Sequence, residues 1–313
     1  MALDPLFQRG IDLISQLDLP DSELLERFYL PPTNAVYPDV EAVDYQVAGS
    51  EFSIPVRVYK PWGEKVRPAL FWMHGGGFIG GDLNVVEADV ISRELASRLD
   101  AVIISSDYRL CNEKVRFPAP HIDIYEAFTW AVNNTDFQIN PQQIFIGGGS
   151  AGACLAASLQ LRLRDEKFPL AATLLIYPIT HDQLPPQSKE LLEKTKGIPR
   201  QLLFEESFIA SHNAFLRDGL PAGVAPYYFF SGEAKDLTRL SPTLIINSEY
   251  DTLRASGEEY ARQLRSAGND LSEFLQEGAI HGQLAFYPQD SVSCEETLVL
   301  MTNYINRYLK AKE

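Results

Sequence analysis

The stretch QIFIGGGSAG, residues 143–152, decides the fold. Its apolar first half predicts a buried strand, and the small residues from Ala151 onward predict a helix. Ser150 stands in the turn between the two, where flanking glycines allow a strained backbone and close neighbours. A strand, a sharp turn and a helix in this order expose a serine hydroxyl at the edge of a sheet. Ser150 is therefore a candidate nucleophile.

An alternative interpretation of these glycines is a phosphate-binding loop. Such a loop carries Gly-Lys-Ser or Gly-Lys-Thr, or belongs to a dinucleotide-binding fold with an acidic residue at a set distance. Residues 143–152 contain no Gly-Lys pair, and no acidic residue follows them as a dinucleotide fold requires. The nucleophile interpretation is favoured.

Further apolar runs lie on both sides of this stretch and alternate with helical patterns. The runs are continuous rather than alternating, which indicates a parallel sheet buried on both faces by helices. Two shorter runs on either side of Gly49 and Ser50 predict a hairpin. The continuous runs are 69–73, 101–105, 171–177, 243–247 and 272–276, the hairpin strands are 43–47 and 54–59, and the clearest helices are 85–99 and 121–134.

One interval, residues 182–240, contains no clear strand. It carries Pro185-Pro186, helical patterns near 187–196 and 200–216, and an aromatic cluster at 227–230. We interpret 182–240 as a helical cap segment inserted over the strand ends. The predicted helices of residues 1–40, which end near Pro31-Pro32, join it in space. The core that carries the sheet then consists of residues 41–181 and 241–313. An alternative stays open, in which the aromatic cluster fills the core.

The composition excludes several classes of function. Acidic residues outnumber basic ones by 42 to 27, and the formal net charge of −15 repels a nucleic acid backbone. Three cysteines without a Cys-x-x-Cys pair indicate neither a disulfide framework nor a zinc site.

The N-terminus lacks the features of a signal peptide, and the most apolar stretch is about half of the ~20 residues that span a bilayer. We expect a cytoplasmic protein without stable membrane insertion. The cysteines are Cys111, Cys154 and Cys294.

A second glycine motif, HGGGF at residues 74–78, ends the run 69–73. Consecutive glycines let backbone N–H groups face a ligand without obstruction by side chains. Such donors suit an oxyanion hole, which stabilises the negative oxygen of a tetrahedral intermediate. The alternative is a flexible turn, which the pairing with the serine motif at a later strand end disfavours.

A serine nucleophile needs a base and an orienting acid, which follow it in the order acid, then histidine. His281 follows the last predicted strand and is the best base among the five histidines. Glu249 and Asp251 both follow the run 243–247. Asp251 lies farther into the loop, where its carboxylate can reach His281, so Glu249 is interpreted as a structural partner.

With these landmarks the chain resembles the hormone-sensitive-lipase family of esterases. The resemblance implies an α/β-hydrolase fold with a mostly parallel central sheet, helices on both faces and a helical cap. It also implies that the substrate is a small-molecule carboxylic ester with a short acyl chain, which is hydrolysed through an acyl-enzyme intermediate. The resemblance implies no metal or cofactor, and it is compatible with a homodimer. The matching motifs are HGGGF (74–78), SDYRL (106–110), FPA (117–119), GGSAG (148–152), YDTLR (250–254) and HG (281–282).

The resemblance also assigns individual residues. The catalytic triad carries over to Ser150, Asp251 and His281. The oxyanion donors carry over to the N–H groups of Gly76, Gly77 and Ala151, with His74 and Gly75 as the supporting loop.

Two departures concern the surroundings of this site. Gly149 stands where the family usually has aspartate, and Gln283 stands where an aromatic residue is usual. Two other activities use the same fold. One is a non-catalytic receptor such as the plant gibberellin receptor, which has lost the histidine that is present here as His281. The other is hydrolysis of amides or arylformamides by the same triad.

Overall fold

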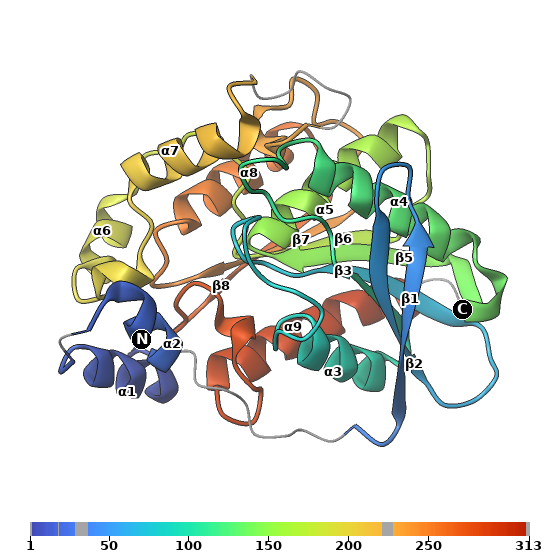
Figure 1. Ribbon diagram of the computed structural model, residues 1–313, viewed down its shortest axis with the longest axis horizontal. Coiled ribbons are helices and arrows are strands. Elements are labelled where there is room, and N and C mark those ends of the chain that lie inside the picture. Colours follow the sequence, from blue (N-terminus) through green and yellow to red (C-terminus); the bar gives the residue numbers. More distant parts are fainter. Residues whose placement is uncertain (1, 18, 29–36, 221–227, 311–313) are drawn as a thin grey trace.

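The computed structural model describes residues 2–17, 19–28, 37–220 and 228–310 (Figure 1). Within these residues, eight strands form one sheet in the order β1-β2-β4-β3-β5-β6-β7-β8. Five of the seven neighbouring pairs are parallel, so the predicted α/β fold with a mostly parallel sheet is confirmed. The strands are β1 (Val40–Ala48), β2 (Ser53–Pro61), β3 (Arg67–Met73), β4 (Val102–Ser106), β5 (Ile139–Gly149), β6 (Ala172–Ile176), β7 (Thr243–Ser248) and β8 (Leu271–Gln276).

The antiparallel part of the sheet is the predicted hairpin and its neighbour. Ala48 pairs with Ser53, and the N–H of Gly49 donates to the carbonyl of Phe52 over 3.1 Å, which closes the turn between β1 and β2. β2 then pairs with β4 in antiparallel orientation. The parallel strands β3 to β7 are apolar along most of their length because helices cover both faces.

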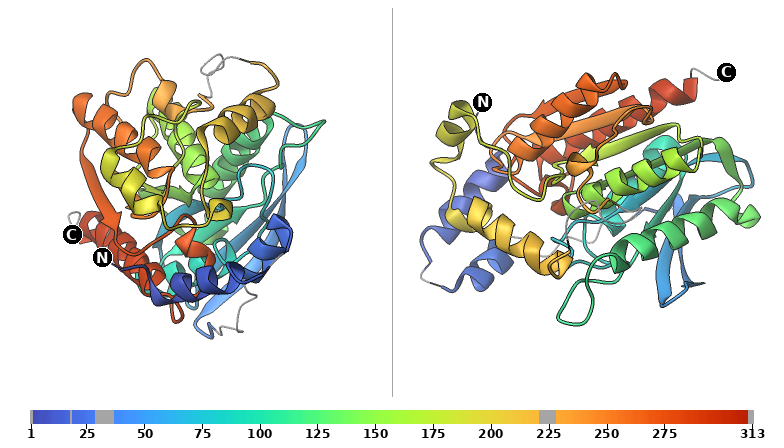
Figure 2. Two further views of the ribbon diagram at one scale, coloured as in Figure 1. Left: turned by 90° about the vertical axis from the view of Figure 1, so that its left-hand side faces the viewer. Right: turned by 90° about the horizontal axis from the view of Figure 1, so that it is seen from above.

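The long helices form two layers, one on each face of the sheet (Figures 1 and 2). Helices α4, α5 and α8 pack on one face, and α3 and α9 pack on the other. No helix in the described ranges is long and apolar enough to cross a membrane. The bounds are α3 (Asp89–Leu99), α4 (Ala119–Asn133), α5 (Ala151–Asp165), α8 (Arg254–Ser266) and α9 (Val292–Lys310).

The shorter helices gather at one end of the molecule. The described part of the cap segment contains α6 (Lys189–Thr195) and α7 (Glu206–Arg217) and no strand. The N-terminal helices α1 (Pro5–Ile14) and α2 (Asp21–Phe28) share an apolar cluster with Ile198 and Leu202 of this segment and with Ile280 beside His281. The N-terminal helices and this segment are therefore in contact, and their assignment as a cap stays a prediction.

The described part of the aromatic cluster, residues 228–230, belongs to the main core. Phe229 and Phe230 are almost completely buried. The ring of Phe229 packs on Phe78 and Phe117, and the ring of Phe230 packs on Phe229. These two rings lie in the core, as the alternative interpretation of the cluster expects. Residue 227 and the Pro31-Pro32 pair lie outside the described residues.

Candidate active site

Ser150 occupies a strained turn between β5 and α5. Its backbone has φ +52° and ψ −116°, a left-handed conformation that non-glycine residues seldom adopt outside functional sites. The start of α5 lies directly against the end of β3: a Cβ atom on Gly152 would stand 2.0 Å from the carbonyl oxygen of Met73. Glycine is required at position 152 for this approach, which holds the turn at the edge of the sheet.

The structure brings Ser150, His281 and Asp251 into one chain of hydrogen bonds. The hydroxyl of Ser150 lies 2.9 Å from Nε2 of His281, and Nδ1 of His281 lies 2.7 Å from Oδ2 of Asp251. Asp251 is fully buried, and its other oxygen accepts the N–H of Leu253 over 2.9 Å. The buried carboxylate accepts a hydrogen bond from Nδ1–H, so that Nε2 is free to accept the proton of the serine. The catalytic roles of these residues stay a prediction.

Glu249, the second candidate acid, points elsewhere. Its carboxylate accepts the N–H of Gly278 over 2.8 Å and forms an ion pair with Lys194. Burial alone would raise the pKa of Glu249, but the hydrogen bonds from Gly278 and Lys194 together lower it. The carboxylate therefore braces the loop that precedes His281, in line with its interpretation as a structural partner.

The side chain of His74 supports the glycine loop, residues 74–78. Its ring is buried, stacks on Tyr108 at 4.6 Å, and places Nδ1 2.7 Å from the carbonyl oxygen of Gly75. Burial lowers the pKa of His74, so the ring is neutral and donates this bond from Nδ1. A Cβ atom on Gly75 would lie 3.3 Å from Cβ of Ser150, so the loop passes directly beside the candidate nucleophile.

The backbone N–H groups of this region differ in their contacts. The N–H of Gly75 donates to Oε2 of Glu87 over 3.0 Å, so it is not a donor toward a substrate. Gly76 and Gly77 follow it in the loop that passes Ser150. Ala151 is the first residue of α5, and the first N–H groups of a helix have no partner within the helix. This arrangement is compatible with the donors that the resemblance implies, whose role stays a prediction.

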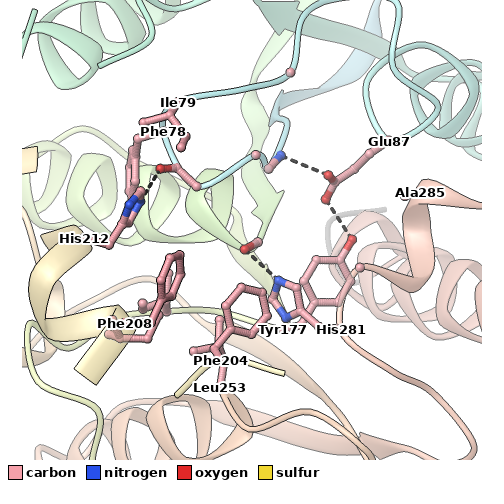
Figure 3. Close-up of a pocket in the computed structure, with 18 of the residues that line it drawn as sticks. Phe78, Ile79, Glu87, Tyr177, Phe204, Phe208, His212, Leu253, His281 and Ala285 are labelled. Atoms are coloured by element: carbon pink, nitrogen blue, oxygen red, sulfur yellow. Dashed lines mark hydrogen bonds between the residues drawn. The ribbon is translucent and has the colours of Figure 1, made fainter. Parts of the chain in front are cut away.

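Two residues of the site are absent from the sequence prediction. Glu87 is buried between the glycine loop and Tyr177, whose hydroxyl donates to Oε1 of Glu87 over 2.7 Å (Figure 3). Burial raises the pKa of Glu87, while the hydrogen bonds from Tyr177 and Gly75 act in the opposite direction. The one hint in the sequence is Gly149, because the family usually has a carboxylate there.

A cavity of about 430 Å³ opens in front of Ser150 and His281. His212 of α7 also reaches this cavity, and its Nε2 lies 2.8 Å from the carbonyl oxygen of Gly77. The side chain of Gln283 lies in the protein interior, where its amide oxygen accepts a hydrogen bond from the Ser248 hydroxyl. The apolar walls are formed mainly by Phe78, Ile79, Ile179, Phe204, Phe208 and Ile209.

The chain is similar to known esterases in sequence and in structure. Residues 70–285 match a family described by the α/β-hydrolase fold. The arylesterase of Saccharolobus solfataricus is 29% identical over 257 residues, which cover 78% of this chain and 77% of that protein. Carboxylic ester hydrolase LipN of Mycobacterium tuberculosis is 32% identical over 255 residues, which cover 79% of this chain and 65% of that protein. The solved structure of a hyperthermophilic esterase from Pyrobaculum calidifontis is similar with a TM-score of 0.77 at 28% identity, covering 97% of this chain and 98% of that one.

Proposed function

Because the chain belongs to the α/β-hydrolase family, in its hormone-sensitive-lipase group of carboxylesterases, we propose that Ser150, His281 and Asp251 form its catalytic triad. The observation that carries this proposal is the continuous pair of hydrogen bonds, 2.9 and 2.7 Å long, from Ser150 through His281 to Asp251. A hydroxyl, a base and an orienting acid in such contact are the arrangement that activates a serine nucleophile.

The reaction takes place in two acyl-transfer steps. Oγ of Ser150 attacks the ester carbonyl carbon while Nε2 of His281 takes the hydroxyl proton. The N–H groups of Gly76, Gly77 and Ala151 stabilise the negative oxygen of the tetrahedral intermediate. His281 then protonates the leaving alcohol, and the acyl group remains on Ser150. In the second step His281 takes a proton from a water molecule while the water oxygen attacks the acyl carbon. The bond between that carbon and Oγ of Ser150 then breaks, His281 returns the proton to Oγ, and the carboxylic acid is released.

The walls of the cavity favour an uncharged ester with a short, apolar acyl group. Of the described residues that line the cavity beyond the triad, Glu87 is the only carboxylate, and it is bonded to Gly75 and Tyr177. A charged substrate would lose its hydration there without gaining an ion pair. A volume of about 430 Å³ is at the small end for ligand pockets.

The Ser150→Ala variant tests the triad. Turnover of p-nitrophenyl butyrate should fall at least ~10³-fold in this variant while the circular dichroism spectrum stays unchanged. A serine-directed phosphonate should label the wild-type protein at one site and should not label the variant. Undiminished turnover in Ser150→Ala would contradict the proposal. An inactive wild-type protein that still binds the ester would favour the receptor alternative.

A panel of substrates tests the preference for acyl-chain length and the preference for the leaving group separately. The p-nitrophenyl esters from acetyl to decanoyl should give the highest kcat/KM among the short chains. The p-nitroanilide of butyric acid should react more slowly than the matching ester. Faster turnover of decanoyl esters would refute the short-chain proposal, and faster turnover of the anilide would favour an amidase, while either result leaves the triad in place.

A further inference from the structure

The carboxylate of Glu87 fills the space beside Gly149, the residue directly before Ser150. A Cβ atom added to Gly149 would lie 1.8 Å from Oε1 of Glu87 and 2.8 Å from the ring of Tyr177. Real Cβ atoms do not approach other heavy atoms this closely. Position 149 therefore cannot carry a side chain while Glu87 keeps its place, and the two residues form a fitted pair beside the nucleophile turn.

Glu87 also links the segments that meet at the site. Its backbone oxygen accepts the indole N–H of Trp72 on β3 over 2.8 Å, which fixes the start of its side chain. Its Oε2 accepts the N–H of Gly75 over 3.0 Å, and its Oε1 accepts the hydroxyl of Tyr177, just after β6, over 2.7 Å (Figure 3). One buried carboxylate thus holds the glycine loop at a fixed distance from the ends of β5 and β6.

We infer that Glu87 is a positioning residue, which holds the glycine loop so that the N–H groups after Gly75 face the oxygen of the reacting ester. This inference rests on the proposed function. When the Gly75 N–H is bonded to Glu87, the peptide units that follow start from a fixed orientation. Without that bond the Gly76 and Gly77 donors lose their alignment, and a displacement of about 1 Å in such a site costs on the order of 10²-fold in rate.

Two substitutions of Glu87 separate its hydrogen bonds from its volume. Glu87→Met keeps the length of the side chain but removes both oxygen acceptors. Glu87→Gln keeps an acceptor for the Gly75 N–H and an amide group that bonds to the Tyr177 oxygen. For p-nitrophenyl butyrate, kcat should fall about 100-fold in Glu87→Met and less than about tenfold in Glu87→Gln, with KM changed by less than about threefold in both. The rate of phosphonate labelling should follow kcat.

A double-mutant cycle tests whether a side chain at position 149 and the Glu87 carboxylate compete for the same space. Gly149→Ala alone should lower kcat by about 100-fold, because its methyl group pushes the Glu87 carboxylate away from Gly75. In the Glu87→Ala background the methyl group no longer meets the carboxylate and only displaces the Tyr177 ring, which has lost its hydrogen bond to Glu87. The second substitution should therefore lower kcat by much less than the loss that it causes alone. If the two single effects multiply, the residues act independently and the inference is wrong.

Ser150→Ala distinguishes the possible failures. If Ser150→Ala retains turnover, the proposed function fails and the Glu87 variants decide nothing further about the triad. If Ser150→Ala is inactive but Glu87→Met has wild-type kcat, the triad stands and the inference about Glu87 is overturned. If circular dichroism shows that Glu87→Met does not fold, the cycle with Gly149 decides the question.

Discussion

The imidazole of His212 donates a hydrogen bond from Nε2 to the carbonyl oxygen of Gly77 over 2.8 Å. This bond joins helix α7 of the cap segment directly to the glycine loop (Figure 3). The ring is held in place by Phe208, one turn earlier on the same helix, which stacks on it at 5.6 Å. The loop is thus held from two sides, by Glu87 through Gly75 and by His212 through Gly77.

Removal of the His212 bond should reduce the catalytic efficiency. His212→Phe keeps an aromatic ring but loses the donor, and the loss of about 1 kcal/mol for one hydrogen bond corresponds to a five- to tenfold lower kcat/KM. His212→Gln should recover most of that loss, because its amide N–H can reach the same carbonyl. Ser211→Ala is the control, since the Ser211 hydroxyl donates to the Phe208 carbonyl within α7. Equal activity of the Phe and Gln variants would argue against a role for the bond.

Asp251 and Glu249 should differ sharply in their effect on activity. Asp251→Asn removes the carboxylate that accepts the hydrogen bond from Nδ1–H of His281. Because the wrong tautomer is then favoured, kcat should fall by about 10⁴-fold. Glu249→Gln is the matched change on the neighbouring acid. It keeps an acceptor for Gly278, loses the ion pair with Lys194, and should lower kcat by less than about tenfold. Comparable losses in both variants would mean that the acid has been misassigned.

The proximity of the three residues proposed as a triad could be predicted, because the topology of the sheet brings them together. Parallel strands end at the same edge of a sheet, so a residue that follows β5 meets residues that follow β7 and β8. Ser150 and His281 lie far apart in the sequence and still come within hydrogen-bonding distance. The choice of Asp251 over Glu249 followed from its place in the loop. The fold was predictable for the same reason, since each buried strand appears as one continuous apolar run.

Glu87 and the ring of Phe229 could not be placed from sequence. A glutamate near the start of a helix has the pattern of a solvated residue, and only the three-dimensional fit beside Gly149 identifies it as buried. Phe229 lies in a strandless interval and yet fills the main core, because that part of the chain returns to pack on Phe78 and Phe117. Such contacts depend on the path of irregular segments, which hydrophobic periodicity does not encode.

Gly152→Ala should damage the nucleophile turn. Its methyl group would meet the Met73 carbonyl oxygen at 2.0 Å, and backbone atoms can give way only if α5 moves away from β3. We expect the free energy of unfolding to fall by about 1–3 kcal/mol and kcat to fall in parallel. Gly197→Ala is the control, because a Cβ atom there has no heavy atom within 4 Å. Urea unfolding and ester turnover of both variants check this, and a harmless Gly152→Ala would contradict the packing argument.

The buried ring of His121 should make the fold sensitive to acid. The centroid of its ring lies 5.1 Å from the ring centroids of both Phe117 and Phe229. Burial lowers the pKa of His121 from an ordinary 6.5 to about 3. The unfolded chain binds a proton at this histidine below pH 6.5, whereas the folded protein does so only near pH 3. The stability that depends on the neutral ring is therefore fully present above pH 6.5 and is lost as the pH falls toward 3.

His121→Phe removes this titration and keeps a ring in the aromatic cluster. Between pH 6 and pH 4, the free energy of unfolding of the wild-type protein should fall more steeply than that of the variant, by about 1.4 kcal/mol per pH unit, which corresponds to one proton. His74 and His181, whose pKa values burial also lowers, are present in both proteins and cancel in the comparison. Phe128→Leu is the control, because it changes core packing without a titratable group and should shift stability equally at each pH. Equal slopes for the wild-type protein and His121→Phe in urea unfolding would show that His121 becomes protonated without unfolding the protein.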